Sequence, residues 1–112
     1  MTCEVDKLGG LVRIRGEMTI YDAAALKDRL FAELEGEPDA RIDLAGVSEL
    51  DTTGIQILIM AARVSAAHGV PFCLANPSAI VIEALELLRL SGWVAGPQLA
   101  APQLAAPQEA RP

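Results

Sequence analysis

The stretch RIDLAGVSELDTTGIQILIMAARVSAA, residues 41–67, changes from a strand pattern to a helix pattern. Apolar and charged residues alternate in Arg41-Ile42-Asp43-Leu44, which predicts a strand with one buried face. Val47 and Leu50 are expected to fill the core beneath the loop that follows. A helix is predicted from about Thr53 to Ala67, and His68-Gly69 suits its C-terminal cap. The segment Asp51-Thr52-Thr53-Gly54 therefore lies where a loop enters a helix.

The same two patterns recur before this stretch. Residues 11–15 alternate after Gly9-Gly10, which predicts a strand that pairs in a hairpin with a short strand around residues 3–5, and Gly16 is expected to end it. A helix is predicted over residues 21–34, because apolar residues recur there at helical spacing. Gly36 and Pro38 end that helix.

Beyond residue 67 the chain predicts one more strand and one more helix. The strand covers residues 71–75. The helix starts at Asn76-Pro77-Ser78, with Asn76 as its possible cap and Pro77 in the first turn, and runs to about Arg89. Helices between strands require crossovers and parallel pairing. The predicted fold is therefore α/β, with a small mixed, mostly parallel sheet of four to five strands and helices packed against it.

The composition changes after Trp93, where Pro-Gln-Leu-Ala-Ala occurs twice, at residues 97–101 and 102–106. Proline at that spacing prevents a regular helix, and such a composition cannot bury a core. We therefore predict one domain over residues 1–95 and a Pro/Ala/Gln-rich flexible tail over residues 96–112.

Composition limits the classes of partner. The net charge is −6 and the pI about 4.6, so the chain lacks the basic footprint of nucleic-acid binders. The longest apolar run, residues 57–62, is far shorter than the roughly 20 residues that span a bilayer, and the acidic N-terminus does not resemble a signal peptide. These features predict a cytoplasmic protein that does not insert into membranes.

Enzymatic chemistry finds little support in the sequence. His68 is the only histidine, and a helix separates it from Thr52 by roughly 20 Å, too far for a general base. Gly-rich phosphate loops and Cys/His spacings typical of zinc sites do not occur. We therefore expect no enzyme, no cofactor and no metal; a small acidic-site hydrolase that uses Asp51 is the enzyme alternative.

The chemistry at residues 51–54 suits an added phosphate. The first amides of a helix lack partners within the helix, and the helix dipole adds partial positive charge there. A phosphate on Thr52 would be tolerated at such a helix end. Gly54 would allow a partner surface to approach closely. The alternative is that Asp51 or Thr52 is only an N-cap, since both residue types are preferred caps.

A second feature is an apolar stripe on the predicted helix. A helical wheel places the expected core face on one side, formed by Ile55, Leu58, Ile59, Ala62 and Ala66. Ile57, Met60 and Val64 fall nearly opposite, which predicts a docking surface beside Thr52. The alternative is that the last helix covers this stripe.

Several segments together resemble a STAS domain, the domain of anti-sigma factor antagonists and of sulfate-transporter tails. They are Gly16-Glu17-Met18, Ile42-Asp43-Leu44-Ala45-Gly46-Val47, Leu50-Asp51-Thr52-Thr53-Gly54-Ile55 and Leu74-Ala75-Asn76-Pro77-Ser78, and the resemblance covers roughly residues 9–93. It implies that Thr52, with Thr53 as the alternative, is phosphorylated by an anti-sigma-type serine/threonine kinase and dephosphorylated by a phosphatase. Asp51 would be the acidic neighbour of the phosphorylated residue.

The resemblance departs from the antagonists at Thr19, where many of them have an acidic residue. In this respect the chain is more similar to STAS proteins of chemotaxis-type signalling, and small subunits of lipid-transport ATPases look alike. The predicted function is a partner-switching phosphoprotein that binds its kinase or regulator when Thr52 is unphosphorylated. The alternative is a constitutive protein-binding subunit of a lipid-transport ATPase or chemotaxis-type complex. The predicted partner-binding residues are Asp51, Thr52, Thr53, Gly54, Ile57, Met60 and Val64.

Overall fold

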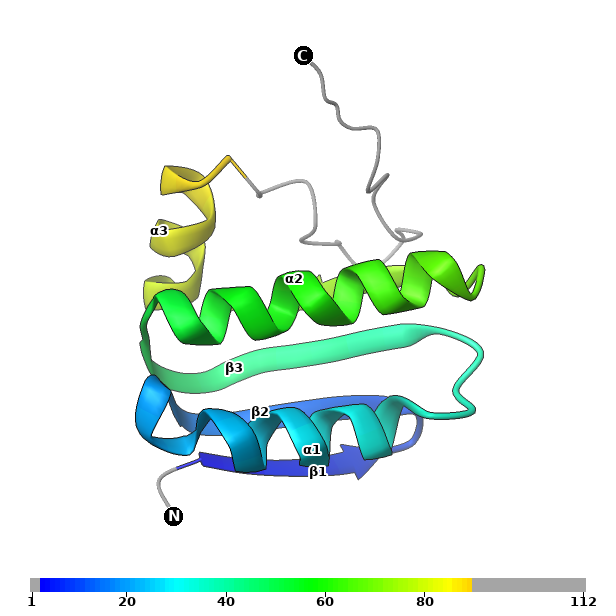
Figure 1. Cartoon of the computed structure of the whole chain (residues 1–112). Helices are drawn as coiled ribbons and strands as arrows, with labels where there is room; N and C mark the ends of the chain where they lie inside the picture. The colour runs from blue at the N-terminus through cyan, green and yellow to red at the C-terminus, as the bar shows by residue number, and fades with distance from the viewer. Residues whose placement is uncertain (1–2, 90–112) are drawn as a thin grey trace.

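The computed structural model describes residues 3–89, which form one sheet and three helices (Figure 1). In chain order the elements are β1 (Cys3–Leu8), β2 (Leu11–Met18), the 3-10 turn η1 (Ile20–Asp22), α1 (Ala23–Leu34), β3 (Ala40–Leu50), α2 (Thr52–Ala67), β4 (Phe72–Ala75) and α3 (Ala79–Leu87). The predicted tail over residues 96–112, and its boundary with the domain at residue 95, lie outside the described residues.

The sheet has the strand order β1-β2-β3-β4. β1 and β2 are antiparallel, whereas β2 with β3 and β3 with β4 are parallel. This confirms the predicted mixed, mostly parallel sheet, with four strands. The hairpin turn is made by Gly9 and Gly10, both with positive φ, where glycine is favoured because it lacks Cβ.

β2 and β3 are both longer than the sequence predicts. Gly16 does not end β2: it adopts a φ of +104°, the register with β3 shifts on either side of it, and the strand continues to Met18. β3 likewise extends to Leu50, with Val47 opposite Gly16 and Leu50 opposite Met18. Val47 is buried and Leu50 packs against the core, as predicted, but both belong to the strand. The sequence does not indicate this, because such an irregularity hides the alternation that marks a strand.

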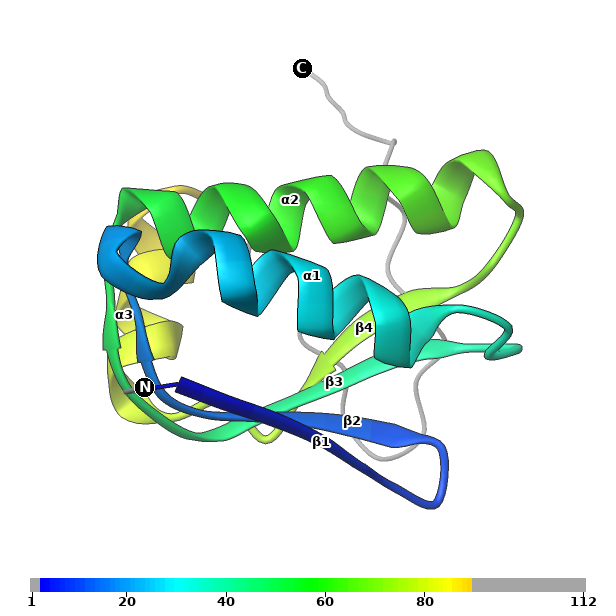
Figure 2. The ribbon, with the colours of Figure 1, turned by 60° about the horizontal axis from the view of Figure 1, so that its bottom comes forward.

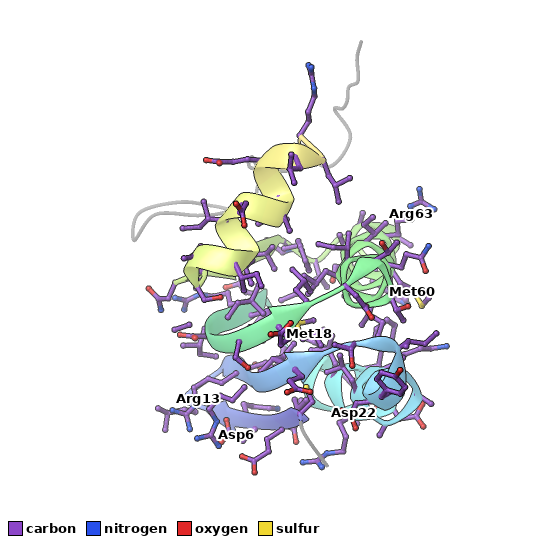
Figure 3. All side chains as sticks on the ribbon, turned by 90° about the vertical axis from the view of Figure 1, so that its left-hand side faces the viewer. Asp6, Arg13, Met18, Asp22, Met60 and Arg63 are labelled. Carbon is purple, nitrogen blue, oxygen red and sulfur yellow. The ribbon has the colours of Figure 1, made fainter. Side chains whose placement is uncertain are left out.

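The helices form two layers around the sheet. α1 and α2 lie side by side on one face, as Figures 1 and 2 show, and Figure 3 places α3 on the other side of the sheet. The core is almost entirely aliphatic, with buried residues from each of the four strands and from α1, α2 and α3. The helices contribute Leu26 and Leu30 from α1, Ile55, Leu58 and Ala62 from α2, and Val81 and Leu85 from α3.

The start of α3 differs from the prediction. Its N-cap is Ser78, not Asn76, and Ser78 makes no capping hydrogen bond with its side chain. Asn76 instead adopts a φ of +48° and donates from Nδ2 to Oδ2 of Asp43 at 2.8 Å. Asparagine tolerates the left-handed region, so Asn76 turns the chain out of β4 two residues before the cap.

Candidate functional site

Asp51 is the single residue between β3 and α2, and it connects three segments. Its Oδ1 accepts a hydrogen bond from the N–H of Gly54 at 3.1 Å, which caps α2. Its Oδ2 accepts from the N–H of Ile20 at 3.0 Å, and its own N–H donates to the carbonyl of Met18 at 3.2 Å. Of the two caps that the sequence allowed, Asp51 is the one observed. It also holds the turn η1 against the start of α2.

The carboxyl of Asp51 stays ionised at neutral pH. Partial burial acts to raise its pKa, but the backbone N–H groups of Ile20 and Gly54 favour the charged form and outweigh that effect. The net pKa is therefore lower than that of an ordinary aspartate. The N-terminus of α2 consequently already has a negative charge bound to it.

Thr52 and Thr53 differ in accessibility. Thr52 is the first residue of α2 and is exposed, whereas Thr53 is half-buried. In Figure 3 this end of the molecule faces the viewer, and Met18 marks the end of β2 beneath it. An approaching protein would therefore meet the hydroxyl of Thr52 before that of Thr53.

The sequence suggested that a partner could approach closely at Gly54, but the structure does not expose this residue. It is buried, and a Cβ at this position would meet the carbonyl oxygen of Met18 and lie 2.7 Å from Cδ1 of Leu50. The glycine is needed because α2 starts directly over the ends of β2 and β3. Its function is to allow close packing of the helix on the sheet.

The predicted docking stripe on α2 is only partly exposed. Ile57 is buried, with 4% of its surface exposed, so the prediction that it belongs to the stripe is wrong. The buried face is wider than one stripe because α2 packs on both the sheet and its neighbours, and it also takes in Ala61 and Ser65. Of the predicted core face, Ile59 is only half-buried and Ala66 is exposed. The observed buried face of α2 is therefore rotated about the helix axis relative to the predicted one.

Met60 and Val64 remain exposed at 38% and 41%. α3 does not cover them, since it lies on the other side of the sheet, and Figure 3 shows Met60 pointing away from it. Thr52, Gln56, Met60 and Val64 are each four residues apart and all exposed, so they form one stripe along α2. This stripe, not the one containing Ile57, leads from Thr52 along the helix.

Val64 lies at the far end of that stripe, in a groove between the C-terminal halves of α1 and α2. The groove has a volume of about 600 Å³, and its apolar lining includes Phe31, Ala61 and Val70. His68 and two glutamates, Glu35 and Glu37, also border it. Since α2 has 16 residues, the groove is separated from Thr52 by much of a helix about 24 Å long.

The sequence reasoning missed two exposed residues beside Asp51. Ile20 is 64% exposed and Tyr21 is 92% exposed, and the hydrogen bond between the N–H of Ile20 and Asp51 places them next to the start of α2. The sequence does show two large side chains, Ile20 and Tyr21, between the polar residues Thr19 and Asp22, but no local pattern links them to residue 51.

Within residues 3–89, no group of three His, Cys, Asp or Glu side chains is placed to hold a metal ion. His68 follows the last residue of α2, and its Nδ1 lies 2.9 Å from the carbonyl oxygen of Val64, at the end of the helix opposite Thr52. None of the helices in the described part is long and apolar enough to cross a membrane.

The order of elements and the loop at Asp51 can be compared with known proteins. A family model described as "Mlab, STAS domain" matches residues 4–99. The chain belongs to the STAS domain family. No curated protein matches the chain closely enough to count as a relative.

Solved structures support the same STAS fold. The chain is similar to the anti-sigma factor antagonist SpoIIAA in its unphosphorylated form, with 18% identity, a TM-score of 0.66 and coverage of 83% of this chain and 85% of that one. A putative anti-sigma factor antagonist from Thermotoga maritima gives 21% identity, a TM-score of 0.67 and 82% coverage of each chain. A serine-to-glutamate variant of RsbS from Moorella thermoacetica gives 20% identity and a TM-score of 0.61. The match covers 88% of this chain and 89% of that one. At these identities the similarity establishes the fold.

Proposed function

We propose that this STAS domain is a partner-switching phosphoprotein. It binds a serine/threonine kinase or related regulator in the cytoplasm while Thr52 is unphosphorylated, and phosphorylation of Thr52 releases the partner. A phosphatase reverses the modification. The observation that supports this proposal is the position of Thr52, exposed and first in α2, directly after the Asp51 cap. The solved structures named as anti-sigma factor antagonists have the same fold.

Accessibility favours Thr52 over Thr53 as the phosphorylated residue. A kinase must bring the γ-phosphorus of ATP to the hydroxyl oxygen, and the exposed Thr52 is open to such an approach. The new bond joins that oxygen to the γ-phosphorus while the bond to ADP breaks, and the hydroxyl proton passes to a base of the kinase. Thr53 is half-buried, so the same approach would require the start of α2 to open.

A phosphate on Thr52 would alter the surface more than the fold. It adds roughly 1.5 to 2 negative charges at neutral pH. The carboxylate of Asp51 already accepts from the N–H of Gly54 at this helix end. Repulsion from Asp51 would direct the phosphate outward, away from the backbone, and so place it in the contact with a partner.

The competing proposal is a constitutive binding subunit in which Thr52 touches a partner but never carries phosphate. The family model that matches residues 4–99 is described as "Mlab, STAS domain". The two proposals differ in what happens to Thr52 in the cell.

Phosphate mapping in the native cell tests the switch. Tryptic peptides of the wild type, Thr52→Ala and Thr53→Ala proteins are compared by mass spectrometry under several growth conditions. The switch predicts phosphate on wild type and on Thr53→Ala, and none on Thr52→Ala. Phosphate that persists in Thr52→Ala and disappears in Thr53→Ala would move the site by one residue, and its absence from all three would support the constitutive subunit.

A further inference from the structure

The turn η1 exposes two large apolar side chains next to Thr52. Ile20 is 64% exposed and Tyr21, the only tyrosine in the chain, is 92% exposed. The hydrogen bond from the N–H of Ile20 to Oδ2 of Asp51, 3.0 Å long, fixes this turn against the start of α2. Because the backbone is already held, burying these side chains against a partner would need little further ordering. Tyrosine is also enriched among the residues that dominate binding energy in interfaces.

The same end of the molecule is acidic. The segments 16–22 and 47–56 contain four carboxylates, Glu17, Asp22, Glu49 and Asp51, and no lysine, arginine or histidine. The parallel register puts Glu17 beside Glu49 and so brings the two segments together. These carboxylates are four of the fifteen acidic residues of the chain.

Two basic side chains of β2 form ion pairs with carboxylates of β1. Arg13 forms an ion pair with Asp6, with Nε 3.0 Å from Oδ1, and Arg15 pairs with both Glu4 and Asp6. Figure 3 shows Arg13 and Asp6 together at β1 and β2, on the side away from Met60. At the acidic end Glu49 is exposed, as are Ile20 and Tyr21 of the turn η1.

We propose that this acidic end, defined by Ile20, Tyr21, Glu49 and Thr52, docks a protein whose contact surface carries lysine and arginine around an apolar pocket that receives Tyr21. The proposal rests on the proposed function and gives the chemistry of the partner at that site. Charge complementarity selects such a partner, because matching potentials speed association and exclude wrong partners.

The same charges argue against other occupants. A second copy docked on this end would bring two sets of four carboxylates together, and a nucleic acid would be repelled for the same reason. The remaining C-terminal residues, 90–112, contain one Glu and one Arg and so supply no net positive charge.

A charge on Thr52 acts differently from the surrounding acids in this arrangement. Glu49 lies on exposed surface and can face basic side chains across a solvated rim. Thr52 lies beside the apolar contact, where a charge would lose its water without gaining a partner. Phosphate on Thr52 would therefore weaken binding although the partner is basic.

Site-specific photo-cross-linking identifies the partner and tests the contact. A benzophenone amino acid replaces Tyr21 in the full chain, which is expressed in the native cell. A control variant has the same amino acid in place of Leu8. Leu8 is 62% exposed but lies at the hairpin turn, the opposite end of β2. The proposal expects one protein to be cross-linked from position 21 and not from position 8, through a peptide rich in lysine and arginine. An acidic contact peptide, or no cross-link at position 21, overturns it.

That protein, purified alone, is then the probe for binding measurements at two salt concentrations. We expect Tyr21→Ala to weaken binding at least about tenfold and Glu49→Lys to weaken it and reduce its salt dependence. Leu8→Ala and Glu35→Lys, an apolar truncation and the same charge reversal at the far end, should bind as the wild type does. All four side chains are exposed, and unchanged melting temperatures show that the variants fold. Wild-type affinity of Tyr21→Ala and Glu49→Lys overturns the proposal.

One further variant separates this proposal from the proposed function. Thr52→Glu should weaken binding, whereas Thr52→Gln, of the same size and without charge, should weaken it less. If Thr52→Glu binds normally while Tyr21→Ala fails, the docking surface stands and the phosphorylation switch does not. If Thr52→Glu fails while Tyr21→Ala binds normally, the switch stands and the docking surface does not.

Discussion

The carboxylate of Asp51 accepts a hydrogen bond from the backbone N–H of Ile20 at 3.0 Å, although 31 positions separate the two residues in the sequence. The same carboxylate caps α2 through the N–H of Gly54. One side chain thus sets the position of the exposed turn η1 relative to Thr52. The stability of this end and the proposed partner surface both depend on it.

Two substitutions of Asp51 should destabilise the domain to different extents. Asp51→Ala removes both hydrogen bonds and should lower the free energy of unfolding by about 1–3 kcal/mol at neutral pH. Asp51→Asn keeps one acceptor oxygen, so it can bond either Gly54 or Ile20 but not both, and should cost less. Urea denaturation of the three proteins at pH 7 measures both differences.

The contribution of the Asp51 charge should depend on pH in a defined direction. Its pKa is lower in the folded state than in the unfolded chain, where it is about 3.9. The stabilisation is therefore fully present well above the unfolded pKa of about 3.9 and is lost as the pH falls through the folded pKa. The stability gap between wild type and Asp51→Asn should shrink between pH 5 and pH 2.5. A gap that stays constant over this range would show that the charge does not contribute.

Gly54→Ala should destabilise the domain even though alanine favours helices. Within a helix the exchange ordinarily gains up to about 1 kcal/mol. Here the new Cβ would meet the carbonyl oxygen of Met18, which is backbone and cannot move without shifting β2. We expect a net loss of about 1–3 kcal/mol in the free energy of unfolding. Gly46→Ala should also destabilise the domain, because its Cβ would lie 2.6 Å from Cγ and 3.2 Å from Cβ of Arg15, at the base of that side chain.

Aspartate substitutions on α2 should separate core from surface. Ile57→Asp places a charge at a position that is 4% exposed and should cost about 4 kcal/mol or more, enough to unfold a marginally stable domain. Met60→Asp, at 38% exposure, should change the free energy of unfolding by no more than about 0.5 kcal/mol. Thermal melts followed by circular dichroism compare the two. A cooperative transition at wild-type temperature in Ile57→Asp would contradict the packing of α2.

Two hydroxyl groups should be dispensable. The Oγ1 of Thr19 and the Oγ of Ser78 are buried and have no hydrogen-bond partner among residues 3–89. Thr19→Val keeps the shape and removes an unsatisfied polar group, so it should stabilise the domain by up to about 1 kcal/mol. Ser78→Ala should be nearly neutral, although an N-cap serine usually contributes about 1 kcal/mol. A clear loss of melting temperature in either variant would reveal a hydrogen bond to water at that site.

The sequence predicted the elements well where a simple period was present. Alternation gave residues 41–44 of β3 and residues 11–15 of β2, and helical spacing gave α1 and α2 to within one or two residues. It failed at Gly16 and at Ala45-Gly46, where the register shifts break the alternation although the strands continue. Ile57 was wrongly predicted to be exposed, because a helical wheel contains no information on how many neighbouring elements pack against the helix.

The candidate site was predictable in its chain position but not in its surroundings. Asp51 and Thr52 lie at the helix start that the sequence indicated. The bond from Ile20 to Asp51 depends on β2 and β3 lying side by side, a long-range relationship with no local signal. The same holds for Gly54 in α2, where a side chain is excluded by the carbonyl oxygen of Met18 at the end of β2.

The central claim is that phosphate on Thr52 controls partner binding. The most direct measurement is the affinity of the cross-linked partner for the full chain in two forms, unphosphorylated and phosphorylated on Thr52, by isothermal titration calorimetry. The account predicts that the phosphorylated form binds at least about tenfold more weakly, a loss of about 1.4 kcal/mol or more. Equal affinity of the two forms would contradict it.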